Sequence, residues 1–107
     1  MTNPAWALLV NAASAPYRRA GHFGWHFAWH FARGKLRIDP VFRHLLSQGL
    51  ITPRARVLDI GCGQGLLASL LQAADGLAQS GRWPQGWAAA PLGASVTGID
   101  LMPKDIA

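Results

Sequence analysis

Two acids and a run of glycines are the residues whose types and spacing could hold a ligand. Asp59 precedes Gly61, Gly63 and Gly65, and Asp100 ends a later apolar run. Glycine has no Cβ atom, so a ligand can approach the backbone closely and the turn can take a positive φ. Where such a turn opens a helix, its N–H groups favour a negatively charged ligand group. The pattern therefore predicts a backbone cradle flanked by two carboxylates.

Two strands and one helix must position these residues. The apolar run 57–60 predicts a buried strand, and residues 95–100 predict a second strand. Between them, residues 66–74 predict a helix with four inward leucines: Leu66, Leu67, Leu70 and Leu71. A strand–helix–strand unit implies parallel strands joined by a right-handed crossover. The predicted fold class is therefore α/β, and an acid ending the second strand would reach the ribose hydroxyls of an adenosine ligand.

The spacing of the glycines distinguishes two classes of adenosine ligand. The dinucleotide fingerprint Gly-x-Gly-x-x-Gly would need its third glycine at the position of Leu66. The chain instead has Gly-x-Gly-x-Gly, with Val-Leu-Asp-Ile before it and Val-Thr-Gly-Ile-Asp (96–100) after it. This combination resembles motif I and the second motif of class I S-adenosylmethionine-dependent methyltransferases, and the resemblance covers about residues 40–102.

The resemblance implies a role for each matching residue. The backbone at Gly61 and Gly63 would hold the methionine portion of S-adenosylmethionine, with its carboxylate near the helix N-terminus. Asp59 would face the amino group of the cofactor. Asp100 would accept hydrogen bonds from both ribose hydroxyls, and the two residues after it would lie against the adenine. The predicted cofactor-binding residues are Asp59, Gly61, Cys62, Gly63, Gly65, Asp100, Leu101 and Met102.

The implied reaction is transfer of the methyl group to an acceptor nucleophile by in-line displacement. A small-molecule acceptor is the first expectation, and its identity cannot be read from the sequence. Most of the rate would come from holding acceptor, methyl and sulfur in line. No catalytic residue can be named. Cys62 has no identifiable base partner, so it is interpreted as a small residue that fills the turn.

The chain departs from the family pattern in two places. Asp100 lies 35 positions after Gly65, more than the roughly 20 of an uninterrupted crossover. A loop over residues 76–93 accounts for the excess, and its Trp83 and Trp87 are expected to cover a local apolar patch. The chain also ends soon after the second strand. We therefore expect an incomplete, Rossmann-like doubly wound sheet over residues 54–107, with an open apolar edge that pairs with a complementing chain or a second copy.

The preceding residues, 1–53, are predicted to form a helical segment. Asn3-Pro4 and Asp39-Pro40 each combine an N-cap residue with proline at the first helical position. The first helix has an apolar stripe of Trp6, Leu9, Val10 and Ala13, and Pro16 is expected to end it. The later helix has an apolar face of Val41, Phe42, Leu45 and Leu46, and Gly49 is placed as its C′ residue.

The tetrapeptide Trp-His-Phe-Ala occurs twice in tandem, at residues 25–28 and 29–32. It helps to space His22, His26 and His30 by four, a spacing that can hold a metal ion on a helix. No metal site is predicted, because no cysteine or acid lies nearby to complete one. The phenylalanines with the same spacing indicate packing: Phe23, Phe27 and Phe31. In the resembled family, helices ahead of motif I help to shape the acceptor site, so the candidates for acceptor contact are Tyr17, His22 and Trp25.

Charge is distributed unevenly along the 107 residues. Residues 1–56 contain eight Lys or Arg and one acid, whereas residues 57–107 contain two basic residues and four acids. The simpler interpretation is a solvated helical surface. The alternative is an RNA acceptor, held by phosphate contacts and base stacking at Arg18, Arg19, Arg33, Lys35 and Arg37 and the aromatic residues among them. A further alternative is a non-catalytic remnant of a methyltransferase.

Cysteine content and hydrophobic patterning bear on the compartment. A single cysteine rules out an intrachain disulfide, and no apolar run reaches the roughly 18 residues of a membrane span. Residues 5–15 lack the preceding basic residues of a signal peptide and are interpreted as a helix. The predicted location is the cytoplasm, with no membrane partner.

Overall fold

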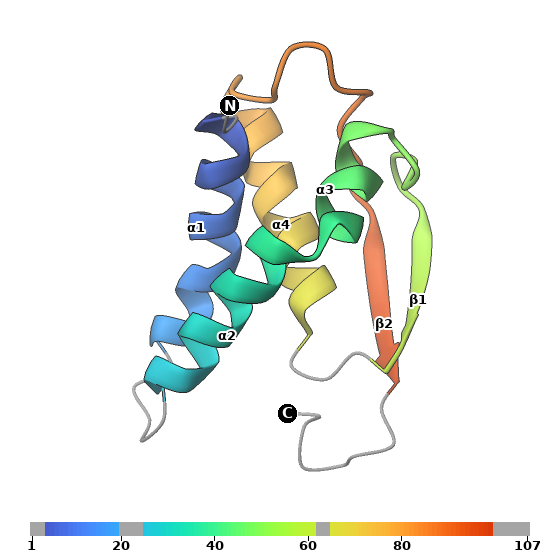
Figure 1. Ribbon diagram of the computed structural model, residues 1–107. Helices are drawn as coiled ribbons and strands as arrows, with labels where there is room; N and C mark the ends of the chain where they lie inside the picture. The colour runs from blue at the N-terminus through green and yellow to red at the C-terminus, as the bar shows by residue number, and fades with distance from the viewer. Residues whose placement is uncertain (1–3, 20–24, 62–64, 100–107) are drawn as a thin grey trace.

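The computed structural model describes residues 4–19, 25–61 and 65–99 (Figure 1). Its elements follow one another along the chain as α1 (Pro4–Arg19), α2 (Trp25–Ile38), α3 (Pro40–Ser47), β1 (Arg56–Ile60), α4 (Leu66–Gln79) and β2 (Ser95–Ile99). Within these described ranges, four helices and a two-stranded sheet make the fold mixed α/β, as predicted. None of the described helices is both long enough and apolar enough to cross a membrane.

The two strands pair in parallel, in the predicted strand–helix–strand order. Their register runs from Arg56 opposite Ser95 to Ile60 opposite Ile99. Successive residues of a strand point to opposite faces, and Val57 and Val96 pack against the core. Because the strands are parallel and are paired along their full lengths without an offset, their carboxyl ends meet at one edge of the sheet.

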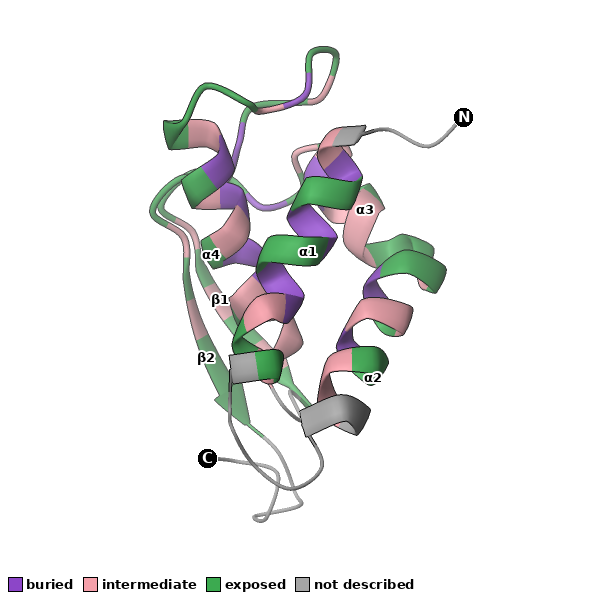
Figure 2. Cartoon of the chain, turned by 90° about the vertical axis from the view of Figure 1, so that its left-hand side faces the viewer, coloured by how far each residue is buried: buried purple, intermediate pink, exposed green. Residues whose placement is uncertain are grey.

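The core lies among the helices, and the stripe predicted on α1 forms part of it. All four of its residues are buried: Trp6, Leu9, Val10 and Ala13. They form one cluster with Leu36 of α2, Leu46 of α3, and Leu70 and Leu71 of α4. Figure 2 shows the buried positions of α1, α2 and α4 turned toward one another. The cluster therefore draws on both the helical segment 1–53 and the segment 54–107.

Helix α1 does not end at Pro16, contrary to the prediction, and continues to Arg19. A proline inside a helix removes one N–H donor and disturbs the preceding turn. The buried hydroxyl of Ser14 lies in that turn and donates to the carbonyl oxygen of Val10 at 2.7 Å. Tyr17, directly after the proline, is half-buried against α4, so packing beyond Pro16 offsets the local cost of the proline.

The start and end of α3 follow the sequence prediction. The Asp39 carboxylate accepts a hydrogen bond from the Val41 N–H at 3.1 Å, and the helix ends before Gly49, which has a φ of +64°. Lys35 pairs with the same carboxylate at 2.9 Å. The Lys35 bond and, second, the Val41 bond lower the pKa of Asp39. One predicted inward residue is wrong: Val41 is exposed, because this short helix buries a narrow face centred on Leu46.

Helix α4 is longer than predicted and ends at Gln79, so the loop begins at Ser80. The four predicted inward leucines do pack into or against the core. Gly76 is tolerated in the last turns because tertiary packing outweighs its low helix propensity. In the loop, Trp83 and Trp87 meet edge to face at 5.5 Å, and Trp87 lies 6.3 Å from Trp6. Both cover a local apolar patch, as expected, at the end of the molecule away from the strands' carboxyl ends (Figure 1).

The strand β1 is covered on one face only, so the prediction of a buried strand is wrong for its other face. Leu58 is 56% exposed, Ile60 is 78% exposed and Ile99 of β2 is 47% exposed. These three side chains share the outer face by the alternation of the strands. The strands lie at the margin of the molecule in Figures 1 and 2. Parallel sheets are normally covered on both faces, and here the described helices pack on one.

Candidate cofactor-binding site

The turn after β1 begins and ends at glycines that need their backbone freedom. Gly61 and Gly65 both have a φ of +76°. In this left-handed region an L-residue with a Cβ atom is strained. Between them, Cys62 and Gly63, two of the predicted cofactor-binding residues, lie outside the described residues. The described ends of the turn therefore follow the predicted strand–turn–helix pattern.

No described residue crowds these two glycines. A Cβ atom built on Gly61 or on Gly65 would have no neighbour within 4 Å. The turn therefore requires glycine for its φ angles and not for close packing against described parts of the protein. A backbone that faces open space with no side chain of its own is suited to contact with a ligand.

The N-terminus of α4 has neither a capping side chain nor an acidic residue in its first turn. Gly65 is its N-cap. The N–H groups of the first turn of a helix have no partner within the helix. In this 14-residue helix they combine with the helix dipole to favour an anionic group. A carboxylate or phosphate close to the turn would satisfy them.

The register of the sheet brings the second strand to the same place. Ile60 pairs with Ile99, and the Gly61 N–H donates to the Ile99 carbonyl oxygen at 2.6 Å. Asp59 is half-buried and lies opposite Gly98, which has no side chain to cover it. Both strands, α4 and the end of α1 all reach the lower edge of the molecule in Figure 1. The predicted residues after β2, namely Asp100, Leu101 and Met102, lie outside the described residues.

One predicted acceptor-contact residue, Tyr17, lies close to this edge. Its hydroxyl is 3.4 Å from the Ser69 hydroxyl, one turn into α4. Partial burial raises the pKa of Tyr17 above its ordinary value of 10.0, and the bond to Ser69 lowers it by a smaller amount. The phenol therefore stays protonated at neutral pH and can donate a hydrogen bond. Ser69 was not predicted; its position one turn after Gly65 was the available signal.

The other predicted features of the N-terminal segment are only partly described. His22 and Phe23 are outside the described residues, as are the side chains of Trp25, His26 and Phe27. No group of three metal-binding side chains occurs in the parts of the chain that the structure describes. His30 meets the Trp29 ring edge to face at 4.7 Å. Phe31 is 52% exposed, so the expectation that it packs inward is wrong.

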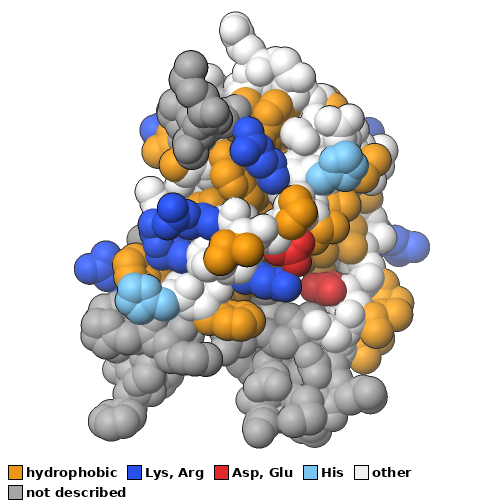
Figure 3. Space-filling model, in the orientation of Figure 1, with side chains coloured by type: hydrophobic (Ala, Val, Ile, Leu, Met, Phe, Trp, Pro, Cys, Tyr) orange, Lys and Arg blue, Asp and Glu red, His pale blue; other side chains and the backbone are white. Residues whose placement is uncertain are grey.

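Two of the predicted basic residues gather around one tryptophan. The guanidinium groups of Arg18 and Arg33 lie 5.4 and 5.1 Å from the centre of the Trp29 ring, within cation–π range. Arg33 also donates to the Asn11 side chain. Figure 3 shows a group of basic side chains over the helical part of this face, and hydrophobic side chains together with a basic one at the margin formed by the strands. The cluster of positive charge around Trp29 therefore belongs to α1 and α2, while the outer sheet face carries the exposed Arg56.

Comparison with known proteins reaches only the part of the chain before the glycine turn. Residues 13–58 match the model of a family described as "Protein of unknown function (DUF3146)". The match covers less than half of the chain, from α1 into β1, and stops before Gly61. No curated protein and no solved structure shows a significant match. The matched family assigns no activity to the helices, and the glycine turn must be interpreted from its own geometry.

Proposed function

We propose that this chain binds S-adenosylmethionine at the turn between β1 and α4, and that it is the cofactor-binding part of a cytoplasmic methyltransferase. The observation that carries the proposal is the parallel pairing of Ile60 with Ile99, the last residues of the two strands. This pairing brings the carboxyl ends of β1 and β2 together, and the sequence has an acid one position before the end of β1 and another one position after the end of β2. The same arrangement supports interpreting the two strands as the start of a doubly wound, Rossmann-like sheet.

The described residues fit the charged end of this cofactor. No described residue lies within 4 Å of the Cβ position at Gly61 or Gly65, which supports the approach of a ligand to the backbone there. The first turn of α4 would hold the carboxylate, and Asp59 would hold the amino group. Asp100, one position beyond the end of β2, would accept the ribose hydroxyls. When bound, the cofactor supplies an activated methyl group; the residues named here bind and orient it and leave the choice of acceptor to other groups.

The position of Tyr17 supports a role on the acceptor side. Its hydroxyl lies beside Ser69, near the end of α4 where the cofactor's charged end is proposed to sit. The raised pKa keeps this hydroxyl protonated, so it can donate a hydrogen bond to an acceptor atom. It would orient a small-molecule acceptor by this hydrogen bond. Because in-line displacement depends mostly on alignment, such a positioning contact can affect rate strongly.

Calorimetric titration with S-adenosylhomocysteine tests the proposal directly. We expect one site per chain, with binding weakened at least about ten-fold in Asp59→Asn and in Asp100→Ala, because each loses a charge-assisted hydrogen bond. Asp39→Asn is the matched control: its asparagine can still cap α3, and its binding should equal that of the unmodified chain. Absence of saturable binding by a folded chain would contradict the proposal, and so would equal affinity in all three variants.

The exposed sheet margin supports a proposal about partners. β1 has β2 on one side, and no described strand pairs with its other edge. An unpaired, apolar edge is a template for another strand, so we propose that β1 pairs with a second copy or a complementing chain. Sedimentation of the pure chain should show association that Leu58→Lys reduces, with Arg56→Gln as the control on the same face. A monomer at all concentrations would exclude the second copy, and lack of any partner strand in cross-linking would exclude both.

The cluster around Trp29 supports RNA as a second candidate acceptor. Two guanidinium groups held against one ring form a local positive surface on α1 and α2. Phosphate contacts make such binding steeply dependent on salt. Single-stranded RNA should bind the chain at low salt and lose affinity in Arg18→Ala and Arg33→Ala. Binding that is unchanged in both variants, or independent of salt, would remove RNA from consideration.

A further inference from the structure

A groove between α1 and α4 lies apart from the glycine turn. It has a volume of about 500 Å³ and is lined by Leu8, Leu9 and Ala12 of α1 and by Ala73, Gly76 and Leu77 of α4. This volume lies within the roughly 300–1,000 Å³ of small-molecule sites. The groove is associated with the C-terminal half of α4, whereas the glycine turn precedes its first residue. The two sites can therefore be tested separately.

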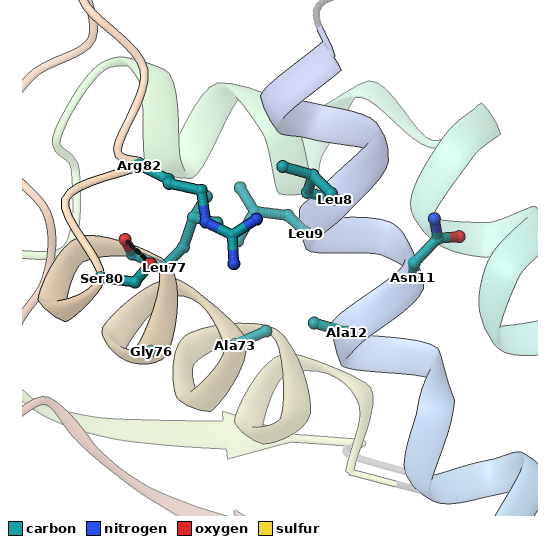
Figure 4. Close-up of a pocket in the computed structure, with 9 residues that line it drawn as sticks. All are labelled: Leu8, Leu9, Asn11, Ala12, Ala73, Gly76, Leu77, Ser80 and Arg82. Atoms are coloured by element: carbon teal, nitrogen blue, oxygen red, sulfur yellow. Dashed lines mark hydrogen bonds between the residues drawn. The ribbon is translucent and has the colours of Figure 1, made fainter.

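Small side chains on both helices create the groove. Ala12 faces Ala73 across it in Figure 4, and a Cβ atom built on Gly76 would have no neighbour within 4 Å. Leu9 and Leu77 are buried beneath, while Leu8 is partly exposed at the rim. The walls are thus apolar, and larger side chains at these positions would fill the space.

One cationic side chain reaches across the opening. Arg82 follows the end of α4, and its guanidinium group extends toward α1 between Leu8 and Leu9 on one side and α4 on the other (Figure 4). Its backbone N–H is bonded to Leu77. Among the described residues, Arg82 has no carboxylate partner within ion-pair distance. The other polar side chains that line the groove, those of Asn11 and Ser80, are uncharged, so Arg82 is its one charged group.

We propose that this groove binds a small amphipathic monoanion, of the class of straight-chain carboxylates, with its tail between α1 and α4 and its carboxylate on Arg82. The guanidinium fork matches the two oxygens of a carboxylate. A single positive charge neutralises a monoanion and leaves a dianion unbalanced. The apolar walls exclude a ligand that is polar throughout, because its polar groups would lose water without gaining partners.

Calorimetric titration with octanoate tests the charge and the tail separately. The chain should bind one octanoate, and octanol or acetate should bind at least about ten-fold more weakly, since each lacks one of the two parts. Arg82→Gln should lower octanoate affinity by a similar factor. Arg37→Gln, an exposed arginine on α2, is the matched control and should leave the affinity unchanged.

A second pair of variants tests the groove itself. Gly76→Leu should fill it and abolish octanoate binding, whereas Gly34→Leu should not. Both glycines are helical, and a Cβ atom at either would meet nothing within 4 Å. Circular dichroism melting of each variant confirms folding before titration. Octanoate binding that survives both Arg82→Gln and Gly76→Leu would overturn the proposal, as would no saturable binding to the unmodified chain. S-adenosylhomocysteine titration of the same variants distinguishes this site from the glycine turn.

Discussion

The helical layer and the sheet contain similar leucines and isoleucines but bury them very differently. Leu9, Leu36 and Leu70 have no exposed surface, whereas most of Leu58 and Ile60 is exposed. The difference lies in the neighbours, because each helix meets others across its apolar face while the sheet has described helices on one face. An apolar residue stabilises the fold only where another element covers it.

The largest expected effect on stability comes from shortening one leucine in the helical layer and comparing it with the same change in the sheet. Leu70→Ala should lower the free energy of unfolding by about 3 kcal/mol, because it leaves a cavity in the closed core. Leu58→Ala should change it by less than about 1 kcal/mol, since the side chain is mostly in water. Urea unfolding followed by circular dichroism measures both. Equal losses would mean that Leu58 is covered in solution, and repeating the measurement at several protein concentrations would reveal whether a second copy covers it.

Two glycines with positive φ, one in each region, test the same difference in packing with a smaller expected effect. Gly49→Ala should cost about 2–3 kcal/mol, because its Cβ atom would lie 2.6 Å from the Ala88 Cβ as well as taking a strained φ. Gly65→Ala, beside the sheet, should cost about 1 kcal/mol from the φ alone. The same urea titrations apply. A larger loss at Gly65 than at Gly49 would contradict the open space described at the turn.

Substitution of Gly76 is expected to increase the stability of the protein, in contrast to the substitutions above. Gly76→Ala should raise the free energy of unfolding by about 1 kcal/mol, because alanine has the higher helix propensity and its Cβ meets open space. The melting temperature should rise, and binding of S-adenosylhomocysteine at the opposite end of α4 should stay the same. Gly34→Ala in α2 is the matched helical control and should also stabilise. Destabilisation by Gly76→Ala alone would show that the α1–α4 groove is closed in solution.

The smallest expected effect is a shift in the titration of Tyr17, the one tyrosine of the chain. Its ultraviolet absorbance should report a pKa above 10.0 in the folded protein and near 10.0 in denaturant, because burial disfavours the phenolate. Its contribution to stability is then complete below pH 10 and is lost as the pH rises through the folded-state value. Tyr17→Phe should weaken this alkaline dependence. A folded-state pKa at or below 10.0 would contradict the burial of the hydroxyl against α4.

Local rules predicted the helical layer well. The stripe on α1, the Asp39 cap and the inward leucines of α4 follow from helical periodicity and capping, which need only neighbouring residues. Rules based on single residues failed where tertiary packing competed with them. Pro16 and Gly76 both lie inside helices because burial along α1 and α4 outweighs local propensity. Val41 is exposed because the direction of a face depends on elements far away in sequence.

The candidate site was predictable in outline. Glycine spacing and the short strands located Gly61 and Gly65, and their φ angles agree with that choice. The contact between Tyr17 and Ser69 could not be predicted in detail, since it depends on how α1 crosses α4. The same holds for Arg82, whose significance comes from a groove that two distant helices form. No spacing rule links positions that far apart.

Because α1 packs on α4, α1 must remain partly uncovered during synthesis until α4 has been made. Tyr17 and Ser69 are 52 positions apart. At the usual ribosomal rate of 5–20 residues per second, about 3–10 s separate their appearance. Until α4 emerges, the apolar stripe of α1 has only α2 to pack against, and its other side stands open to chaperones and to neighbouring nascent chains. Slower translation between α1 and α4 would lengthen that exposure in direct proportion.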